Sequence, residues 1–144
     1  MGSMRPAQVF AAVGGIVYLA VGLIGFAVTG FGDLIADSND ALMGFSLNPF
    51  HNLIHVGAGL LLIVGSRLQR PGAAEGINLG VGLVLVLAAF LGFTGNLSLL
   101  SISTSGDPDN YLHLATGLVA MAFGFIGAPS RGALQQREVP LRLD

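Results

Sequence analysis

The chain has 144 residues, of which 53% are hydrophobic and only 10% charged, and its mean hydropathy is +0.77. A soluble domain carries about 25% charged residues, so 6 basic and 8 acidic side chains are too few to cover a water-exposed surface of this size. The composition therefore excludes a soluble enzyme, a nucleic-acid-binding protein and a disordered linker, and it indicates an integral membrane protein. Cysteine is absent, which excludes disulfides and thiolate metal sites.

Four apolar stretches are close to the ~20 residues that a helix needs to cross a bilayer. They cover residues 7–30, 49–66, 77–96 and 108–128. Backbone groups in lipid must be satisfied within their own segment, so each stretch is expected to form a helix. At Asn48-Pro49 and Asp107-Pro108, a capping side chain precedes a proline, which is a typical start of a helix.

All four spans are expected to form one transmembrane domain, residues 1–144. Gly2-Ser3 precedes a second methionine, so residues 1–3 are interpreted as a vector remnant. Residues 129–144 follow the last span and are expected to form a cytoplasmic tail.

The placement of charge predicts the orientation. All the bases precede the first span, lie between the second and third, or follow the fourth: Arg5, Arg67, Arg70, Arg131, Arg137 and Arg142. The positive-inside rule then places both termini and the loop 67–76 in the cytoplasm. The loops 31–48 and 97–107 lie outside and carry Asp33, Asp37, Asp40 and Asp107.

The outer loop 31–48 allows two interpretations. Asp33, Asp37 and Asp40 fall at helical spacing, with apolar residues elsewhere on the wheel, as in a short amphipathic helix on the outer leaflet. An irregular loop with scattered acidic residues is the equal alternative.

The second and fourth spans repeat the same pattern. Residues 51–60 and 109–118 carry Asn, His, Gly and Leu at identical offsets, with Asn52 and His55 matching Asn110 and His113. The first and third spans match more loosely, at Gly25-Phe26 and Gly92-Phe93. The sequence thus predicts an all-α, integral membrane four-helix bundle of two tandem hairpins, related by a pseudo-two-fold axis along the membrane normal.

The motifs that carry this repeat also resemble a known family. They are Asn48-Pro49-Phe50-His51-Asn52-Leu53-Ile54-His55 with Gly59, Asp109-Asn110-Tyr111-Leu112-His113 with Gly117, and the opening Arg5-Pro6-Ala7-Gln8. Together they resemble small actinobacterial four-helix membrane proteins grouped as a domain of unknown function. The resemblance covers nearly the whole chain and implies a multi-pass protein of the bacterial inner (plasma) membrane. It implies no activity and no ligand.

The three histidines are all expected at the outer side. The i, i+4 spacing of His51 and His55 puts both on one helix face, and Asp109 and His113 repeat that spacing. If the pseudo-two-fold axis brings the second and fourth spans together, the four side chains converge near the outer mouth. Three imidazoles and a carboxylate suit Zn²⁺ or another divalent transition metal.

Two interpretations of these polar residues remain open. In the first, a metal is bound, and Asn52 and Asn110 orient its ligands by hydrogen bonds. In the second, the histidines and asparagines only bond neighbouring helices, at ~0.6 kcal/mol each, and the protein is a structural or accessory membrane subunit. Tyr18, midway along the first span, either packs or joins such a network.

The sequence gives less support to two further functions. A b-type haem held by His55 and His113 would lack basic partners for its propionates, because the outer half has no Arg or Lys. An interfacial metal-dependent hydrolase is conceivable, but no nucleophile elbow or phosphate-binding loop supports an enzyme. The expected partners are the lipid bilayer and either further copies of the chain or a larger membrane complex. Nucleic acid is not expected to bind.

Overall fold

The computed structural model describes residues 4–35, 40–70 and 72–126. Its four α-helices are α1 (Pro6–Thr29), α2 (Pro49–Arg67), α3 (Ala73–Phe93) and α4 (Pro108–Phe125). Two short strands, β1 (Ala41–Leu42) and β2 (Phe45–Ser46), follow α1, and a 3-10 helix (Ser98–Leu100) lies between α3 and α4. Each predicted span therefore corresponds to one helix, with ends that agree to about one turn. The expected vector remnant, the aspartate at 37, the arginines after α4 and the tail 129–144 lie outside the described residues.

The helix starts predicted from the two prolines are confirmed. The Asn48 side chain accepts a hydrogen bond of 2.8 Å from the His51 backbone N–H, and the Asp107 side chain accepts one of 3.0 Å from Asp109. Helix α3 begins earlier than expected, behind Gly72 in a left-handed conformation. Its first turn therefore contains Glu75, which the sequence had placed outside the span.

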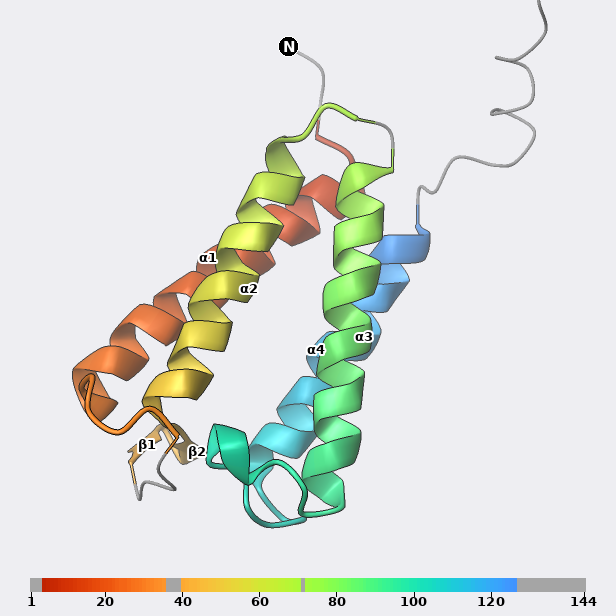
Figure 1. The fold of residues 1–144 in the computed structure, drawn as a ribbon. Helices are drawn as coiled ribbons and strands as arrows, with labels where there is room; N and C mark the ends of the chain where they lie inside the picture. The colour runs from red at the N-terminus through yellow and green to blue at the C-terminus, as the bar shows by residue number, and fades with distance from the viewer. Residues whose placement is uncertain (1–3, 36–39, 71, 127–144) are drawn as a thin grey trace, which may run out of the picture.

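The helices pair as two hairpins, α1 with α2 and α3 with α4 (Figure 1). Glycines allow the close approach in both. A Cβ atom on Gly15 would lie 2.9 Å from the Gly59 carbonyl oxygen, and one on Gly82 would lie 2.7 Å from that of Gly117. These pairs occupy equivalent positions of the internal repeat, which supports the prediction of two tandem hairpins.

Contacts between the hairpins are sparse by comparison. At one end, Arg5 forms an ion pair with Glu75, and the Asn78 side chain donates a 2.9 Å hydrogen bond to the Ala7 carbonyl. Midway, the hydroxyls of Tyr18 and Thr116 lie 3.2 Å apart. The two hairpins therefore meet through a few polar contacts and a thin apolar core, and α2 and α3 diverge toward the end that carries the strands (Figure 1).

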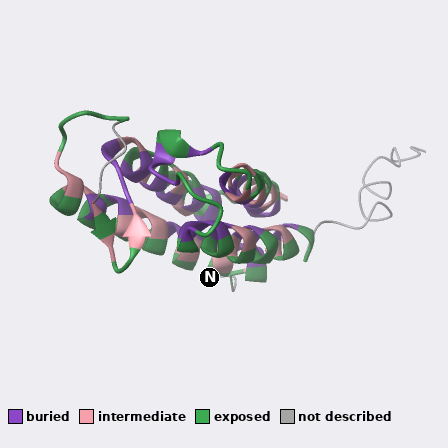
Figure 2. Cartoon of the chain, turned by 90° about the horizontal axis from the view of Figure 1, so that it is seen from below, coloured by how far each residue is buried: buried purple, intermediate pink, exposed green. Residues whose placement is uncertain are grey.

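Polarity is inverted relative to a soluble protein. Buried residues gather where the helices face one another, and exposed residues cover the outward faces (Figure 2). The outward faces are rich in large apolar side chains, including Ile16, Leu23, Leu60, Leu83 and Phe90. An exposed apolar surface of this kind is typical of a membrane or protein interface. Helices α1, α2 and α3 are each long and apolar enough to cross a membrane. Helix α4 is less apolar, because its first turns carry several polar residues.

The loop after α1 forms a β-hairpin in its second half. Leu42 pairs with Phe45 across a turn in which Met43 and Gly44 both have positive φ, at 55° and 90°. This conformation is typical of two-residue hairpin turns. Residues 36–39, which form the centre of the expected amphipathic helix, lie outside the described residues. The two interpretations of the aspartate spacing therefore stay predictions.

Candidate metal centre

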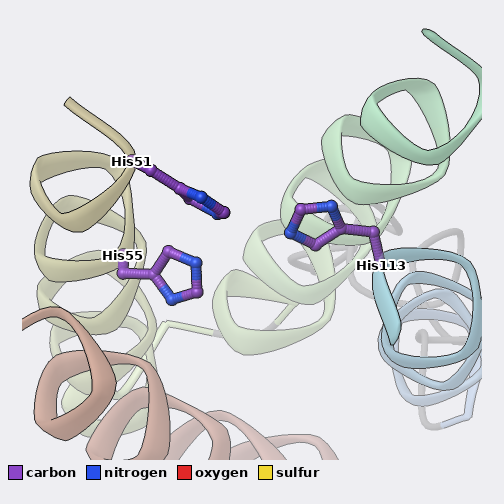
Figure 3. Close-up of side chains that lie close together, drawn as sticks. All are labelled: His51, His55 and His113. Atoms are coloured by element: carbon purple, nitrogen blue, oxygen red, sulfur yellow. The ribbon is translucent and has the colours of Figure 1, made fainter. Parts of the chain in front are cut away.

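The three histidines converge at the end of the bundle that carries the β-hairpin. His51 and His55 extend from α2, and His113 extends from α4 toward them (Figure 3). The ring centroids lie 4.5, 5.7 and 6.4 Å apart, and one nitrogen of each ring lies within 4.8 Å of those of the other two. The relative exposures are only 1%, 8% and 4%. The predicted convergence of these three residues is confirmed.

The local structure explains this placement. Asn48 and Pro49 start α2 so that His51 falls in its first turn and His55 one turn later, on the same face. The loop between α3 and α4 then closes the end of the site. Its buried residues Leu97, Leu100 and Ile102 pack together, and the Asn48 amide donates a 3.0 Å hydrogen bond to the Leu99 carbonyl. The imidazoles are thus shielded from water.

Most of the imidazole nitrogens have no hydrogen-bond partner among the described residues. Four of them are buried in this way: Nε2 of His51, both ring nitrogens of His55 and Nδ1 of His113. Leaving a buried polar atom unbonded costs about 1–3 kcal/mol. Hydrogen bonds within the described part of the chain therefore leave these four nitrogens unsatisfied, and a bound cation would satisfy some of them.

The other ring nitrogen of His51, Nδ1, does have a partner. This nitrogen lies 3.2 Å from the Ser46 carbonyl oxygen, at the end of β2. If Nδ1 donates this hydrogen bond, the Nε2 lone pair is free to bind a metal. A backbone carbonyl in this position is the usual way in which proteins orient a metal-binding histidine.

The donor set fits a transition metal. Zinc–nitrogen bonds of ~2.0–2.1 Å in a tetrahedral site put ligand atoms about 3.3 Å apart. The nitrogens, within 4.8 Å of one another, would have to close by up to about 1.5 Å. The hairpins have few contacts with each other, so a closure of this size would disturb few of them. Three imidazoles would leave a fourth position open, as in zinc sites that bind water or another ligand.

Asp109 lies beside the three histidines and is not one of the group whose atoms converge. Its Oδ2 is 4.0 Å from His51 Nδ1, and it is 2% exposed with no hydrogen-bond partner at that oxygen among the described residues. Asp109 faces the same ring nitrogen as Ser46 does. Its carboxylate is thus placed to act on His51, whereas its expected role as a direct ligand stays a prediction.

Asn52 and Asn110 lie elsewhere in the fold. The Asn52 amide donates a 2.8 Å hydrogen bond to Thr29 Oγ1 and packs against Gly25 of α1. The Asn110 amide donates to the carbonyls of Thr104 and Ser105, at 3.1 and 3.3 Å, and packs against Gly92. Both amides therefore hold their own hairpin together, and neither has a hydrogen bond to a histidine within the described part of the chain.

The position of the His51 ring argues against the haem alternative. A haem between His55 and His113 needs the space around the line that joins their rings for its macrocycle. The His51 ring lies 4.5 and 5.7 Å from those two rings, inside that space. The arrangement thus favours a single small ion over a macrocycle.

Sequence reasoning missed a cavity that begins at the histidines. Its volume is about 410 Å³, and it is lined by Tyr18, the three histidines and apolar side chains of α2 and α3. The Tyr18 ring lies 5.2 Å from that of His55. No sequence signal marks the cavity, because it arises from the separation of two helices whose apolar faces look like any lipid-facing surface.

Comparison with known proteins places the chain in a family. No curated protein and no solved structure matches it. A family model described as a domain of unknown function, DUF4383, matches residues 8–126, a range that contains the three histidines and Asp109. This agrees with the resemblance to a domain of unknown function seen in the sequence motifs. The chain belongs to the DUF4383 family.

Proposed function

We propose that this chain is a multi-pass membrane protein that binds a divalent transition metal, best Zn²⁺, through His51, His55 and His113. One observation carries the proposal: three buried imidazoles direct nitrogens to within 4.8 Å of one another, and most of the ring nitrogens have no hydrogen-bond partner in the described part of the chain. Imidazole is a good ligand for zinc and for its neighbours in the first transition series.

In the proposed arrangement all four helices span the membrane. Helix α4 packs along α3, which is long and apolar enough to cross. Beyond its polar first turns α4 exposes large apolar side chains: Leu118, Val119 and Phe125. The polar turns would lie near the membrane surface, where Asp109 and His113 sit under the closing loop.

The orientation follows from the sorting of charge. Arg5, Arg67 and Arg70 lie at one end of the helices, and Asp33, Asp40, Asp107 and Asp109 belong to the other. The positive-inside rule puts the arginine end of the helices, both termini and the tail 129–144 in the cytoplasm. The resemblance of the sequence motifs implies that the host is an actinobacterium. The metal site would then open near the outer face of the inner membrane. The bilayer would cover the outward apolar faces, and association with further copies or a larger complex stays a prediction.

Asp109 would balance charge in this site. Three neutral imidazoles leave the two positive charges of the ion uncompensated, and buried charge without a partner is costly. The carboxylate near His51 supplies one negative charge, and it would hold the ring with Nε2 turned to the metal. The adjacent Asp107 is already engaged, since it accepts a 2.9 Å hydrogen bond from the Ser46 hydroxyl.

The test is zinc binding by protein purified without a polyhistidine tag. After treatment with a chelator, the protein in phosphatidylcholine nanodiscs is titrated with Zn²⁺, and bound metal is counted by mass spectrometry. We expect one ion per chain. The variant His113→Gln should bind at least ~100-fold more weakly, since even the loss of a group that only orients a ligand costs 10–100-fold. Asn96→Ala is the matched control, because Asn96 is exposed and its side chain donates hydrogen bonds to Thr94 and to no other described residue. This variant should bind zinc as the wild type does.

Two results would contradict the proposal. One is wild-type protein that takes up no zinc and no other divalent transition metal. The other is undiminished binding when His51, His55 and His113 are all replaced by Gln. Either result would leave the role of a structural or accessory membrane subunit.

A further inference from the structure

The cavity that begins at the histidines has one polar end and an apolar body. His51, His55 and His113 line one end, and the body is formed by side chains such as Ile54, Leu61 and Val84. Its volume of about 410 Å³ lies within the range of ~300–1,000 Å³ for small-molecule sites. Leu61 and Val84 are about half exposed, at 49% and 61%. The cavity therefore opens sideways between α2 and α3, onto the surface that faces lipid.

The cavity has the dimensions and direction of one lipid chain. Its α3 lining runs from Ala88 to Ile77, which at 1.5 Å per residue is about 16 Å along the helix. One leaflet contributes about half of the ~30 Å hydrocarbon core, so the two lengths agree. The histidines lie at the end of the helices where a lipid of that leaflet has its headgroup. A chain bound here would keep the orientation that it has in the membrane.

The net charge at the polar end of the cavity, with a metal ion bound, determines which lipid headgroup fits there. Among the residues that the structure describes, no Asp, Glu, Lys or Arg lines the cavity. With a divalent ion on three neutral imidazoles and Asp109 beside them, one positive charge remains to be compensated. A carboxylate carries that single charge and can occupy the open fourth position of the metal. A phosphate needs several hydrogen-bond donors, and the hydroxyl of Tyr18, whose ring lies 5.2 Å from that of His55, is already engaged with Thr116.

We infer that this cavity binds a single-chain lipid with a carboxylate headgroup, a long-chain fatty acid, whose carboxylate completes the coordination of the metal. The inference rests on the proposed metal site and adds the class of its ligand. The chain enters from the bilayer between α2 and α3, and its apolar tail lies against the side chains that line the body.

The test uses Co²⁺ in place of Zn²⁺, because the visible spectrum of Co²⁺ reports its ligands. The full chain in phosphatidylcholine nanodiscs is loaded with Co²⁺ and titrated with palmitate. In parallel it is titrated with hexadecanol, acetate and hexadecyl phosphate at equal concentrations. We expect palmitate alone to change the cobalt spectrum, saturating at one molecule per chain.

A pair of glycines on α3 tests whether the tail occupies the cavity. Gly80 lines the cavity, Gly76 one turn earlier does not, and a Cβ at either position meets no atom within 4 Å. Gly80→Leu should weaken palmitate binding about tenfold, the equivalent of two displaced methylenes. Gly76→Leu should bind palmitate as the wild type does. Both variants should keep the wild-type affinity for Co²⁺.

The outcomes separate the two proposals. Normal Co²⁺ binding with no spectral response to palmitate would overturn the inference and leave the metal site intact. An equal response to acetate would exclude a role for the cavity, and an equal or stronger response to hexadecanol or hexadecyl phosphate would exclude the carboxylate. Failure to bind Co²⁺ and Zn²⁺ would overturn the proposed function, and the inference with it.

Discussion

The ring centroids of His51 and His113 lie 5.7 Å apart, although the helices that carry them belong to different hairpins. Helices α2 and α4 have few other contacts with each other. An ion bound by these residues would therefore join two units that otherwise meet through scattered polar contacts and a thin core. Metal binding and the association of the hairpins should be coupled for this reason.

The first prediction follows from that coupling. Zn²⁺ at a free concentration of about 100 times its dissociation constant should stabilise the folded protein by ~2.7 kcal/mol, and thermal unfolding followed by circular dichroism should show a higher Tm. In the variant His113→Gln, added Zn²⁺ should no longer raise the Tm. The metal-free variant should unfold close to the metal-free wild type, because the lost imidazole has no hydrogen bond at Nδ1 among the described residues. An equal rise in Tm for both proteins would show that zinc acts elsewhere.

The second prediction separates charge at the metal site from hairpin packing, using two adjacent residues. Asp109→Asn should lower zinc affinity about 10–100-fold, because it removes the carboxylate that faces His51 Nδ1. Asn110→Ala should leave zinc affinity within a few-fold of the wild type. It should instead destabilise the fold by about 1–2 kcal/mol, because two hydrogen bonds to the loop before α4 are lost. Zinc titration and chemical unfolding of both variants measure the two effects, and a large loss of affinity in Asn110→Ala would return that residue to a ligand-orienting role.

Neighbouring glycines of α1 provide the third prediction. A Cβ on Gly15 would lie 2.9 Å from both the Gly59 carbonyl oxygen and the Ile63 backbone nitrogen, whereas one on Gly14 meets only Leu62, at 3.9 Å. Gly15→Ala should therefore cost about 1–3 kcal/mol of stability through overpacking. Gly14→Ala should be neutral or slightly stabilising, since alanine favours the helix. Unfolding in increasing dodecyl sulfate compares them, and equal midpoints would contradict the close contact of α1 with α2.

The sequence predicted the features that depend on short-range periodicity. Helix starts at Pro49 and Pro108 followed from local capping chemistry, and the repeat of Asn and His at equal offsets indicated two similar hairpins. The convergence of His51, His55 and His113 needed one further assumption, that the pseudo-two-fold axis brings the second and fourth spans together.

The remaining features depend on tertiary packing. Asn52 and Asn110 recur beside the histidines in the repeat, but they face Gly25 and Gly92 on the partner helix. Their recurrence is explained by equivalent packing contacts within each hairpin. The cavity likewise depends on the angle between two helices, which spacing along one helix does not encode.

The last prediction concerns the opposite end of the bundle, where Arg5 Nη1 and Glu75 Oε1 lie 2.7 Å apart. The Glu75 side chain is 4% exposed and that of Arg5 is 37% exposed. Arg5→Met would leave a buried carboxylate without its partner. We expect a loss of about 1–2 kcal/mol, below the ~3–5 kcal/mol of fully buried pairs because water reaches the arginine.

Glu75→Gln should cost less than Arg5→Met, because it removes the buried charge and leaves a partly solvated arginine. The double variant Arg5→Met/Glu75→Gln should be more stable than Arg5→Met alone. Chemical unfolding of the four proteins completes a double-mutant cycle. Zinc affinity should be the same in all four, because the pair lies at the far end of α1 and α3 from the histidines. If Arg5→Met is no less stable than the double variant, this ion pair does not hold the two hairpins together.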